Sequence, residues 1–339
     1  MDKKGVTSTK HHIREDGFSG TVLVKDHKEV LFQSASGHAN RADECLNELN
    51  TRFGIASGCK LFTAIAIAQL VENNLLSFQT RLKDCLDIEF PYVDERVTIH
   101  HLLTHSSGMA DYFDEERMDD FGDVWKQTPM YLLKNLKDFL PMFQHGKMMF
   151  TPGEKFHYNN AGYIVLGLIV EQQTGISFQE YVEKNIFERC GMEQSGYFSL
   201  DSLPGNTAYG YIDQQDGTWR TNAYSIPIKG GADGGAFVSA SDMIKLWEAL
   251  MDYKLLDEQT TNTLLTPYAH VNEEVDYGYG LWVNYKHNSI YKYHVMGYDP
   301  GVSFHAAFYP QSEVTLAVLS NKSSGARDVM KELEKAFVM

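Results

Sequence analysis

The feature that most constrains this chain is a serine and a lysine three residues apart, Ser57 and Lys60, directly before an apolar run from Leu61 to Val71. The run contains no glycine or proline and its apolar residues recur at helical spacing, so it predicts a buried helix that begins near Ser57. Residues three apart share a helix face, which brings the lysine ammonium beside the serine hydroxyl. Free backbone N–H groups and the positive end of the helix dipole also lie at a helix N-terminus. This setting suits a nucleophile that attacks a carbonyl group, although an N-cap serine followed by a solvated lysine is the structural alternative.

Composition narrows the possible partners. The chain has 339 residues, enough for a large core, and its 43% hydrophobic and 22% charged residues are typical of a globular protein. A formal net charge of −15 argues against nucleic acid or an anionic membrane as partner. No stretch approaches the roughly 18 apolar residues of a membrane span, and no signal peptide is visible. The four scattered cysteines indicate free thiols in a reducing compartment. We therefore expect a cytoplasmic protein, although a secreted protein without its leader would have the same features.

The order of predicted elements indicates one sheet made from both ends of the chain. Residues 21–26 and 30–33 read as a hairpin, and residues 304–309 and 314–319 as another, followed by a helix over about 325–337. Helical patterns occupy much of the middle. We expect an α/β (α+β) fold, with an antiparallel sheet domain from residues 1–80 and 225–339 and a mainly helical inserted domain from residues 81–224.

Two histidines raise the question of a metal. Thr98 can cap a helix that Gly108 would end, and His101 and His105 would then share a face at a spacing that can bind zinc. The glutamate of the H-E-x-x-H motif is missing and no third ligand is evident, which favours a structural pair. We expect neither a metal nor a cofactor.

The middle of the chain contains further candidate elements. Residues 111–123 are acidic and aromatic, typical of a surface loop or lid, and residues 130–143 have helical spacing. Asn159 or Asn160 can cap a helix that ends at Gly175. Tyr158 and Asn160 therefore lie where a loop enters a helix, a common place for functional groups, although a packed aromatic is the plain alternative for Tyr158.

Later segments add a turn-rich stretch and a glycine run. Residues 205–219 indicate a small hairpin, and Ser239 or Ser241 can cap a helix over 242–251. The glycine-rich segment 230–235 allows close backbone approach. It lacks the helix context and lysine of a phosphate loop.

Taken together, these segments resemble the serine β-lactamase and penicillin-binding-protein superfamily. The resemblance is nearest to its class C-like branch, which includes DD-carboxypeptidases, D-aminopeptidases and some esterases. The resemblance covers about residues 20–321. It depends on four ordered blocks, residues 57–60, 101–109, 152–175 and 234–242.

The resemblance implies an active site between an α/β sandwich and a helical domain. By position, Ser57 is the nucleophile, Lys60 holds the proton network beside it, Tyr158 assists as base and then acid, and Asn160 orients the site or the substrate. A neighbouring ammonium favours a phenolate, so we expect the Tyr158 pKa to be lowered. Whether Tyr158 or Lys60 takes the serine proton stays open.

The third motif departs from the family. Counted back from Pro300-Gly301, the triplet Val295-Met296-Gly297 replaces Lys-Thr-Gly or His-Thr-Gly. His294 lies one residue upstream and can supply the missing cation only if a bulge intervenes. The backbone N–H groups of Tyr298 and Ser57 can still form an oxyanion hole.

We therefore predict a serine hydrolase that acts through an acyl-enzyme on Ser57, on a small-molecule or peptide substrate with an ester or amide bond. Because the third motif lacks a cation, neutral substrates should be preferred to carboxylates such as penicillins. The alternatives are a catalytically idle binding protein, a true β-lactamase or DD-carboxypeptidase, and, third, a metal-dependent hydrolase through His101 and His105.

Overall fold

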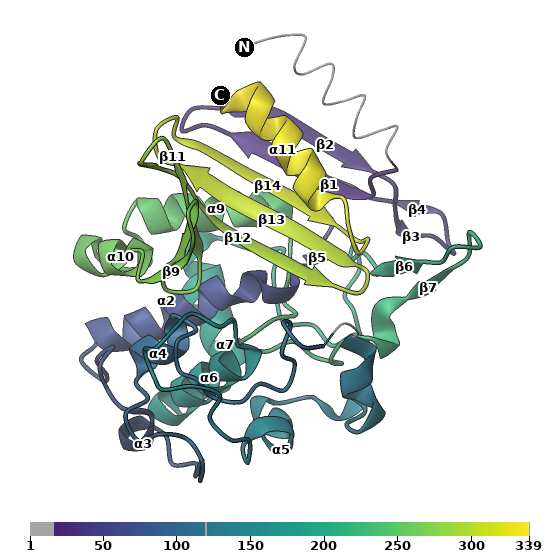
Figure 1. Ribbon diagram of the computed structural model, residues 1–339. Coiled ribbons are helices and arrows are strands. Elements are labelled where there is room, and N and C mark those ends of the chain that lie inside the picture. The colour runs from purple at the N-terminus through teal and green to yellow at the C-terminus, as the bar shows by residue number, and fades with distance from the viewer. Residues whose placement is uncertain (1–16, 119–120, 339) are drawn as a thin grey trace.

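The computed structural model describes residues 17–118 and 121–338. Its centre is an eight-stranded antiparallel sheet (Figure 1). In spatial order the strands are β2 (Val30–Ser36), β1 (Gly20–Lys25), β14 (Val314–Ser320), β13 (Val302–Tyr309), β12 (Ser289–Asp299), β11 (Trp282–Lys286), β10 (Val275–Tyr277) and β9 (Ala269–Asn272). β1 pairs with β14, so both ends of the chain build one sheet, and the two predicted hairpins are confirmed.

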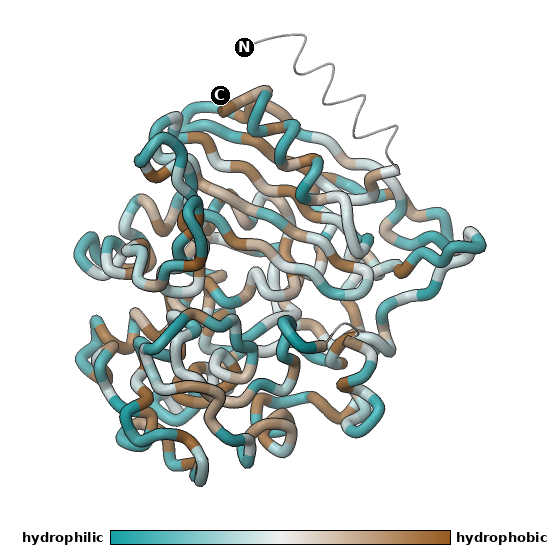
Figure 2. Tube along the Cα trace, in the orientation of Figure 1, coloured by the Kyte–Doolittle hydropathy of each residue, from teal (hydrophilic) through white to brown (hydrophobic). Residues whose placement is uncertain are grey.

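Alternating side chains along the central strands supply two apolar cores, one on each face of the sheet. On β13, Phe304 and Ala306 belong to the larger core, whereas Ala307 and Tyr309 belong to the smaller one. The smaller core is closed by α11 (Ala326–Phe337), which crosses β13 and β14 (Figure 1). The larger core joins the opposite face to the helical half of the molecule. In Figure 2 brown hydrophobic segments run through the strands, and the outlying loops are mainly teal.

Ten α-helices are described besides short turns of other helix types. They are α2 (Lys60–Glu72), α3 (Leu82–Cys85), α4 (Ile99–Leu103), α5 (Leu140–Phe143), α6 (Asn160–Thr174), α7 (Phe178–Val182), α8 (Glu188–Cys190), α9 (Ala240–Met251), α10 (Glu258–Leu265) and α11. The 3₁₀ turns are η1 (Ala56–Cys59), η2 (Phe121–Lys126), η3 (Met130–Leu132), η4 (Leu136–Phe139) and η6 (Asn222–Tyr224), and η5 (Glu183–Phe187) is a π turn. The minor strands are β3 (His38–Asn40), β4 (Cys45–Leu46), β5 (Phe53–Gly54), β6 (Tyr211–Asp213), β7 (Trp219–Thr221) and β8 (Phe237–Val238).

α2 is the central helix of the helical half. Its residues from Lys60 to Leu70 are all buried, as expected for a helix that is apolar on every side. It packs against α6, whose N-cap is Asn159 and whose C-terminus is the left-handed Gly175, both as the sequence predicts. Ser239 likewise caps α9, and β6 and β7 form the small hairpin expected after Gly205.

Two predicted helices were wrong in extent. Residues 130–143 form η3, η4 and α5 rather than one helix, because Asn135 begins a new capping box and Pro141 lacks the N–H that a continuous helix needs. α4 is capped by Thr98 as predicted but ends at Leu103 rather than near Gly108.

Candidate active site

Ser57 is presented to solvent by an otherwise buried turn. The 3₁₀ turn η1 carries Ser57 directly into α2, and residues 55, 56, 58, 59 and 60 are buried while Ser57 is half-buried. Gly58 has no alternative here, since a Cβ would lie 2.4 Å from the Phe304 ring. Behind the turn, β5 pairs with β8 and Gly235 N–H donates to Ala56 O. The nucleophile predicted from the sequence is therefore held on a rigid backbone and open on one side.

The Lys60 ammonium lies where the S-x-x-K spacing predicts. Its side chain is only 1% exposed. Its Nζ is 3.1 Å from Ser57 Oγ, 2.8 Å from Asn160 Oδ1 and 2.8 Å from the Asp233 carbonyl oxygen. A protonated lysine can donate to all three oxygens. After losing a proton, the amine keeps two N–H groups for the two carbonyl oxygens and directs its lone pair at Ser57.

Tyr158 lies beside both Lys60 and Ser57. Lys60 Nζ is 4.8 Å from the centre of the Tyr158 ring, which also packs at 4.3 Å on His105. Burial raises the pKa of the Tyr158 phenol well above its usual value, Glu115 raises it further, and hydrogen bonding with Ser57 lowers it in part. The expected lowering of this pKa by a neighbouring ammonium was wrong, because loss of water outweighs the nearby charge. The phenol is therefore protonated in the resting site.

Asn160 connects the lysine to the start of α6. Besides accepting from Lys60, its amide nitrogen donates to Phe113 O at 3.2 Å and to Glu115 Oε1 at 3.3 Å. Its backbone N–H and that of Ala161 donate to the Asp111 carboxylate, at 2.6 and 2.9 Å. Burial raises the Asp111 pKa to about 7. Sequence reasoning missed Asp111, which lies about 50 residues away and had been assigned only to an acidic loop or lid.

The two histidines have separate structural roles. His105 lies beyond the end of α4, with a positive φ of 55°, so it does not share a helix face with His101 as the sequence suggested. His101 closes the capping box of α4, and His105 Nδ1 accepts from Asn159 N–H at 3.0 Å. Among the described residues no three His, Cys, Asp or Glu side chains are grouped to hold a metal ion.

The third motif lies on β12, with an unbroken register to β13 from Tyr293 to Asp299. The only shift on β12 occurs in its pairing with β11, before Lys292. No bulge therefore turns His294 toward Ser57. It is buried on the strand face that carries Met296 and Tyr298, and neither it nor Val295 lines the cavity. The assignment of His294 as a substrate anchor was wrong for this reason.

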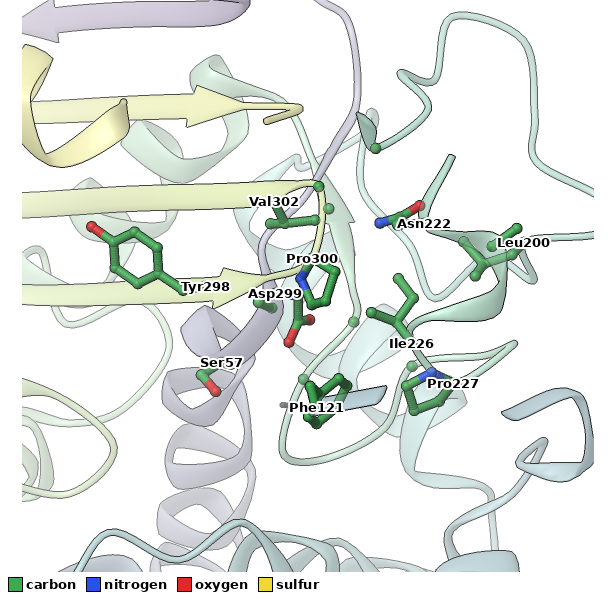
Figure 3. A pocket seen from close by; sticks show the side chains of 18 of the residues that line it. Ser57, Phe121, Leu200, Asn222, Ile226, Pro227, Tyr298, Asp299, Pro300 and Val302 are labelled. Atoms are coloured by element: carbon green, nitrogen blue, oxygen red, sulfur yellow. The ribbon is translucent and has the colours of Figure 1, made fainter. Parts of the chain in front are cut away.

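Gly297 is the residue of this strand that contacts the nucleophile turn. A Cβ on Gly297 would lie 2.1 Å from Ile55 O and 2.9 Å from Ser57 N, so only glycine allows this approach. Tyr298 turns its ring away from Ser57, and its hydroxyl lies 2.6 Å from His305 Nε2 (Figure 3). The Tyr298 side chain is therefore not directed at Ser57.

A cavity of about 620 Å³ opens beside Ser57 (Figure 3). Its polar lining includes Ser57, Asn160, Asp233 and Asp299. One part of its wall is apolar and contains Phe121, Phe139, Phe198, Leu200, Ile226 and Val302. The glycine-rich run 230–235 borders the cavity. Within this run Gly230 and Gly235 touch, which leaves no room for a Cβ on Gly230. Close backbone approach is thus confirmed, and the approach is to the chain itself.

None of the helices in residues 17–118 and 121–338 combines the length and the apolar character needed to cross a lipid bilayer.

Comparison with known proteins gives a consistent result. The Beta-lactamase family profile matches residues 10–338. A crystal structure of a penicillin binding protein from Bacillus halodurans superposes with a TM-score of 0.94 at 58% identity, covering 97% of this chain and 100% of that one. Penicillin-binding protein 4* of Bacillus subtilis (strain 168) is 30% identical over 90% of this chain and 68% of its own length. A teichoic acid D-alanine hydrolase of Staphylococcus aureus (strain MRSA252) is 24% identical over 80% and 64%, respectively. With a family match along nearly its whole length, this chain belongs to the Beta-lactamase family, whose relatives include penicillin-binding proteins and hydrolases.

Proposed function

We propose that this protein is a serine hydrolase that cleaves ester or amide bonds through an acyl-enzyme on Ser57. The observation that carries the proposal is the buried Lys60 Nζ, 3.1 Å from the only half-exposed side chain of the η1 turn. A buried amine within hydrogen-bond reach of an accessible hydroxyl is the geometry of an activated nucleophile.

The arrangement supports distinct roles for Lys60 and Tyr158. In the form with a neutral Lys60 amine, the Ser57 proton passes to Lys60 Nζ as Ser57 Oγ bonds to the substrate carbonyl carbon. A basic leaving group, such as an amine nitrogen or an alkoxide oxygen, takes a proton from the Tyr158 phenol, which its raised pKa keeps protonated until then. In deacylation a water molecule attacks the ester, gives its proton to the Tyr158 phenolate, and Lys60 returns the first proton to Ser57. Between the two halves the ammonium faces the phenolate ring, a favourable pairing.

The substrate oxygen must be stabilised as it becomes negative. The N–H groups of Ser57 and Tyr298 are our candidates for the oxyanion hole, because the β12 backbone at Gly297 packs against the Ser57 nitrogen. β11 pairs with β12 only as far as His294, so the strand beyond it is free to approach a substrate.

Neutral substrates should react faster than carboxylate-bearing ones. Asp233, Asp299 and Glu115 line the cavity, and the third motif contributes no cation there. A carboxylate in this cavity would be poorly solvated and would gain no cation from the third motif. This argues against efficient reaction with penicillins, although a penicillin-binding protein is among the relatives.

The test is acyl transfer to matched probes. We expect the wild type to hydrolyse a neutral p-nitrophenyl ester faster than it is acylated by a fluorescent penicillin, and Ser57→Ala to lose both reactions with an unchanged circular dichroism spectrum. Ester turnover that survives in Ser57→Ala would remove Ser57 from the mechanism. A folded wild type that reacts with neither probe would favour the idle binding protein.

A further inference from the structure

The carboxylate of Asp111 joins the loop after α4 to the start of α6. Its Oδ2 accepts from Asn160 N–H at 2.6 Å, and its Oδ1 accepts from Ala161 N–H at 2.9 Å. Oδ1 also accepts from the N–H groups of the next two residues, Tyr112 and Phe113, at 2.7 and 3.4 Å. All four partners are donors, and an ionised carboxylate is purely an acceptor, so the ionised form fits this position.

These bonds determine which way the Asn160 side chain faces. While Asp111 holds its backbone, its amide nitrogen donates to Phe113 O and Glu115 Oε1, at 3.2 and 3.3 Å. The amide oxygen then accepts from Lys60 Nζ at 2.8 Å. One short segment, residues 111–115, therefore holds Asn160 at its backbone and at its amide nitrogen, and through it the lysine.

A protonated carboxyl would not suit the same four donors. Oδ1 already takes three of them, so a proton has room at Oδ2, the oxygen that holds Asn160. The added O–H would weaken the bond to the Asn160 N–H. Asparagine has the shape of a protonated carboxyl and likewise puts a donor where one acceptor oxygen stood. Asp111→Asn is therefore a close mimic of the protonated state.

The groups around Asp111 determine where it titrates. Burial raises the Asp111 pKa to about 7, although the N–H groups and the Lys60 ammonium act to lower it. Asp111 in turn acts on the phenols of Tyr112 and Tyr158, which stay protonated because burial raises the pKa of both. Glu115 shares the Asn160 backbone and amide with it. Asp111 thus changes its charge within a pH range in which the protein can be assayed.

We propose that Asp111 is a positioning residue whose carboxylate fixes Asn160, so that the amide oxygen of Asn160 holds Lys60 in place. The inference rests on the proposed function of Ser57. Asp111 does not line the cavity, so it acts through its neighbours and not on the substrate. Protonation of the carboxylate would release Asn160, and Lys60 would then be less well placed to take the Ser57 proton.

The experiment measures the rate of fluorophosphonate labelling of Ser57 in the wild type and in Asp111→Asn. The ratio of the two rates is the informative quantity, because the protonation of Lys60 affects both proteins. We expect the wild type to react about tenfold or more faster near pH 8.5, where its carboxylate is ionised. The ratio should approach one near pH 5.5, where Asp111 is protonated. A purely structural role would give the same ratio at every pH.

The control is Asp242→Asn, measured well below its melting temperature. Asp242 is only 1% exposed, and its carboxylate also accepts a backbone N–H, that of Gln194 at 2.7 Å. Its replacement should lower the stability of the protein and leave the labelling rate at the wild-type value at every pH.

A double-mutant cycle tests the route through Asn160. Asn160→Ala should slow labelling near pH 8.5, and adding Asp111→Asn should then cost less than about twofold, because the amide that Asp111 positions is already gone. A wild-type to Asp111→Asn ratio that does not depend on pH would overturn the assignment of Asp111, as would fully additive losses in the cycle.

Two further comparisons keep the outcome decisive. If Asp111→Asn does not fold, the ratio of wild type to Asn160→Ala is measured instead; it should fall toward pH 5.5, and a constant ratio would refute the proposal. Labelling of the wild type separates this proposal from the proposed function. If wild-type Ser57 is labelled and these tests fail, the hydrolase stands and the role of Asp111 is wrong. If wild-type Ser57 is not labelled at all, both proposals fail.

Discussion

The division of labour between Lys60 and Tyr158 predicts an effect that depends on the leaving group. A p-nitrophenolate leaves without a proton, whereas the nitrogen of a p-nitroanilide must be protonated before the C–N bond breaks. If Tyr158 is the acid, Tyr158→Phe should slow the anilide far more than the ester. Lys60→Met, which removes the group that accepts the Ser57 proton, should slow both.

The structure sets the size of these effects. Lys60 Nζ lies 3.1 Å from Ser57 Oγ, within the range for direct proton transfer. Loss of one acid or base costs about 100- to 10,000-fold, so we expect Tyr158→Phe to lower kcat/KM at least about 100-fold for the anilide and less than about tenfold for the ester. Lys60→Met should cost at least about 100-fold with either substrate. Tyr158→Phe keeps the ring packed on His105, which limits any structural effect.

The assay is release of p-nitrophenol or p-nitroaniline by wild type, both variants and two surface controls. Tyr224→Phe removes a hydroxyl from a 77% exposed tyrosine, and Lys134→Met changes an exposed lysine. Melting temperatures confirm that each variant is folded. Equal losses for ester and anilide in Tyr158→Phe would refute the reasoning, because they would mean that Tyr158 acts on the serine proton and not on the leaving group.

Three further predictions concern β12. The Asp299 pKa is raised from 3.8 to about 8, so the folded state holds that proton more tightly than the unfolded state. Wild-type stability therefore falls as pH rises between those values. The melting temperature of Asp299→Asn should exceed that of the wild type near pH 8.5, with the difference closing toward pH 4. Gly297→Ala places a Cβ 2.9 Å from the Ser57 nitrogen and should reduce Ser57 labelling by at least about tenfold, while Gly205→Ala, with open space around it, should not; equal labelling in both would contradict the close approach. His294→Ala should leave the ratio of ester to penicillin acylation unchanged, and a clear shift in that ratio would restore His294 to the substrate site.

The features that could be predicted from the sequence are those that short-range patterns determine. The S-x-x-K spacing placed Lys60 beside Ser57, and cap residues placed the ends of α6, because i to i+3 geometry and capping are short-range effects. Counting back from Pro300 also found the right strand and Gly297. The two-residue period of the strand would also have placed Asp299, which lines the cavity, on the same face as Gly297. The resemblance to the family directed attention to the upstream triplet instead.

Other parts of the site depend on tertiary contacts that no local pattern contains. Asp111 reaches the first N–H groups of α6 from about 50 residues away, and Asp233 presents its carbonyl oxygen to Lys60 across 173 residues. The raised pKa of Tyr158 follows from burial, which sequence spacing does not reveal. His105 was placed on a helix that in fact ends at Leu103.

The most direct test of the central claim is intact-mass measurement of the protein after incubation with a fluorophosphonate, followed by peptide mapping. We predict one adduct per chain, located on the peptide that contains Ser57, formed at least about 100-fold more slowly in Lys60→Met and absent in Ser57→Ala. An adduct of the same mass in Ser57→Ala, or one mapped to another serine in the wild type, would contradict the account.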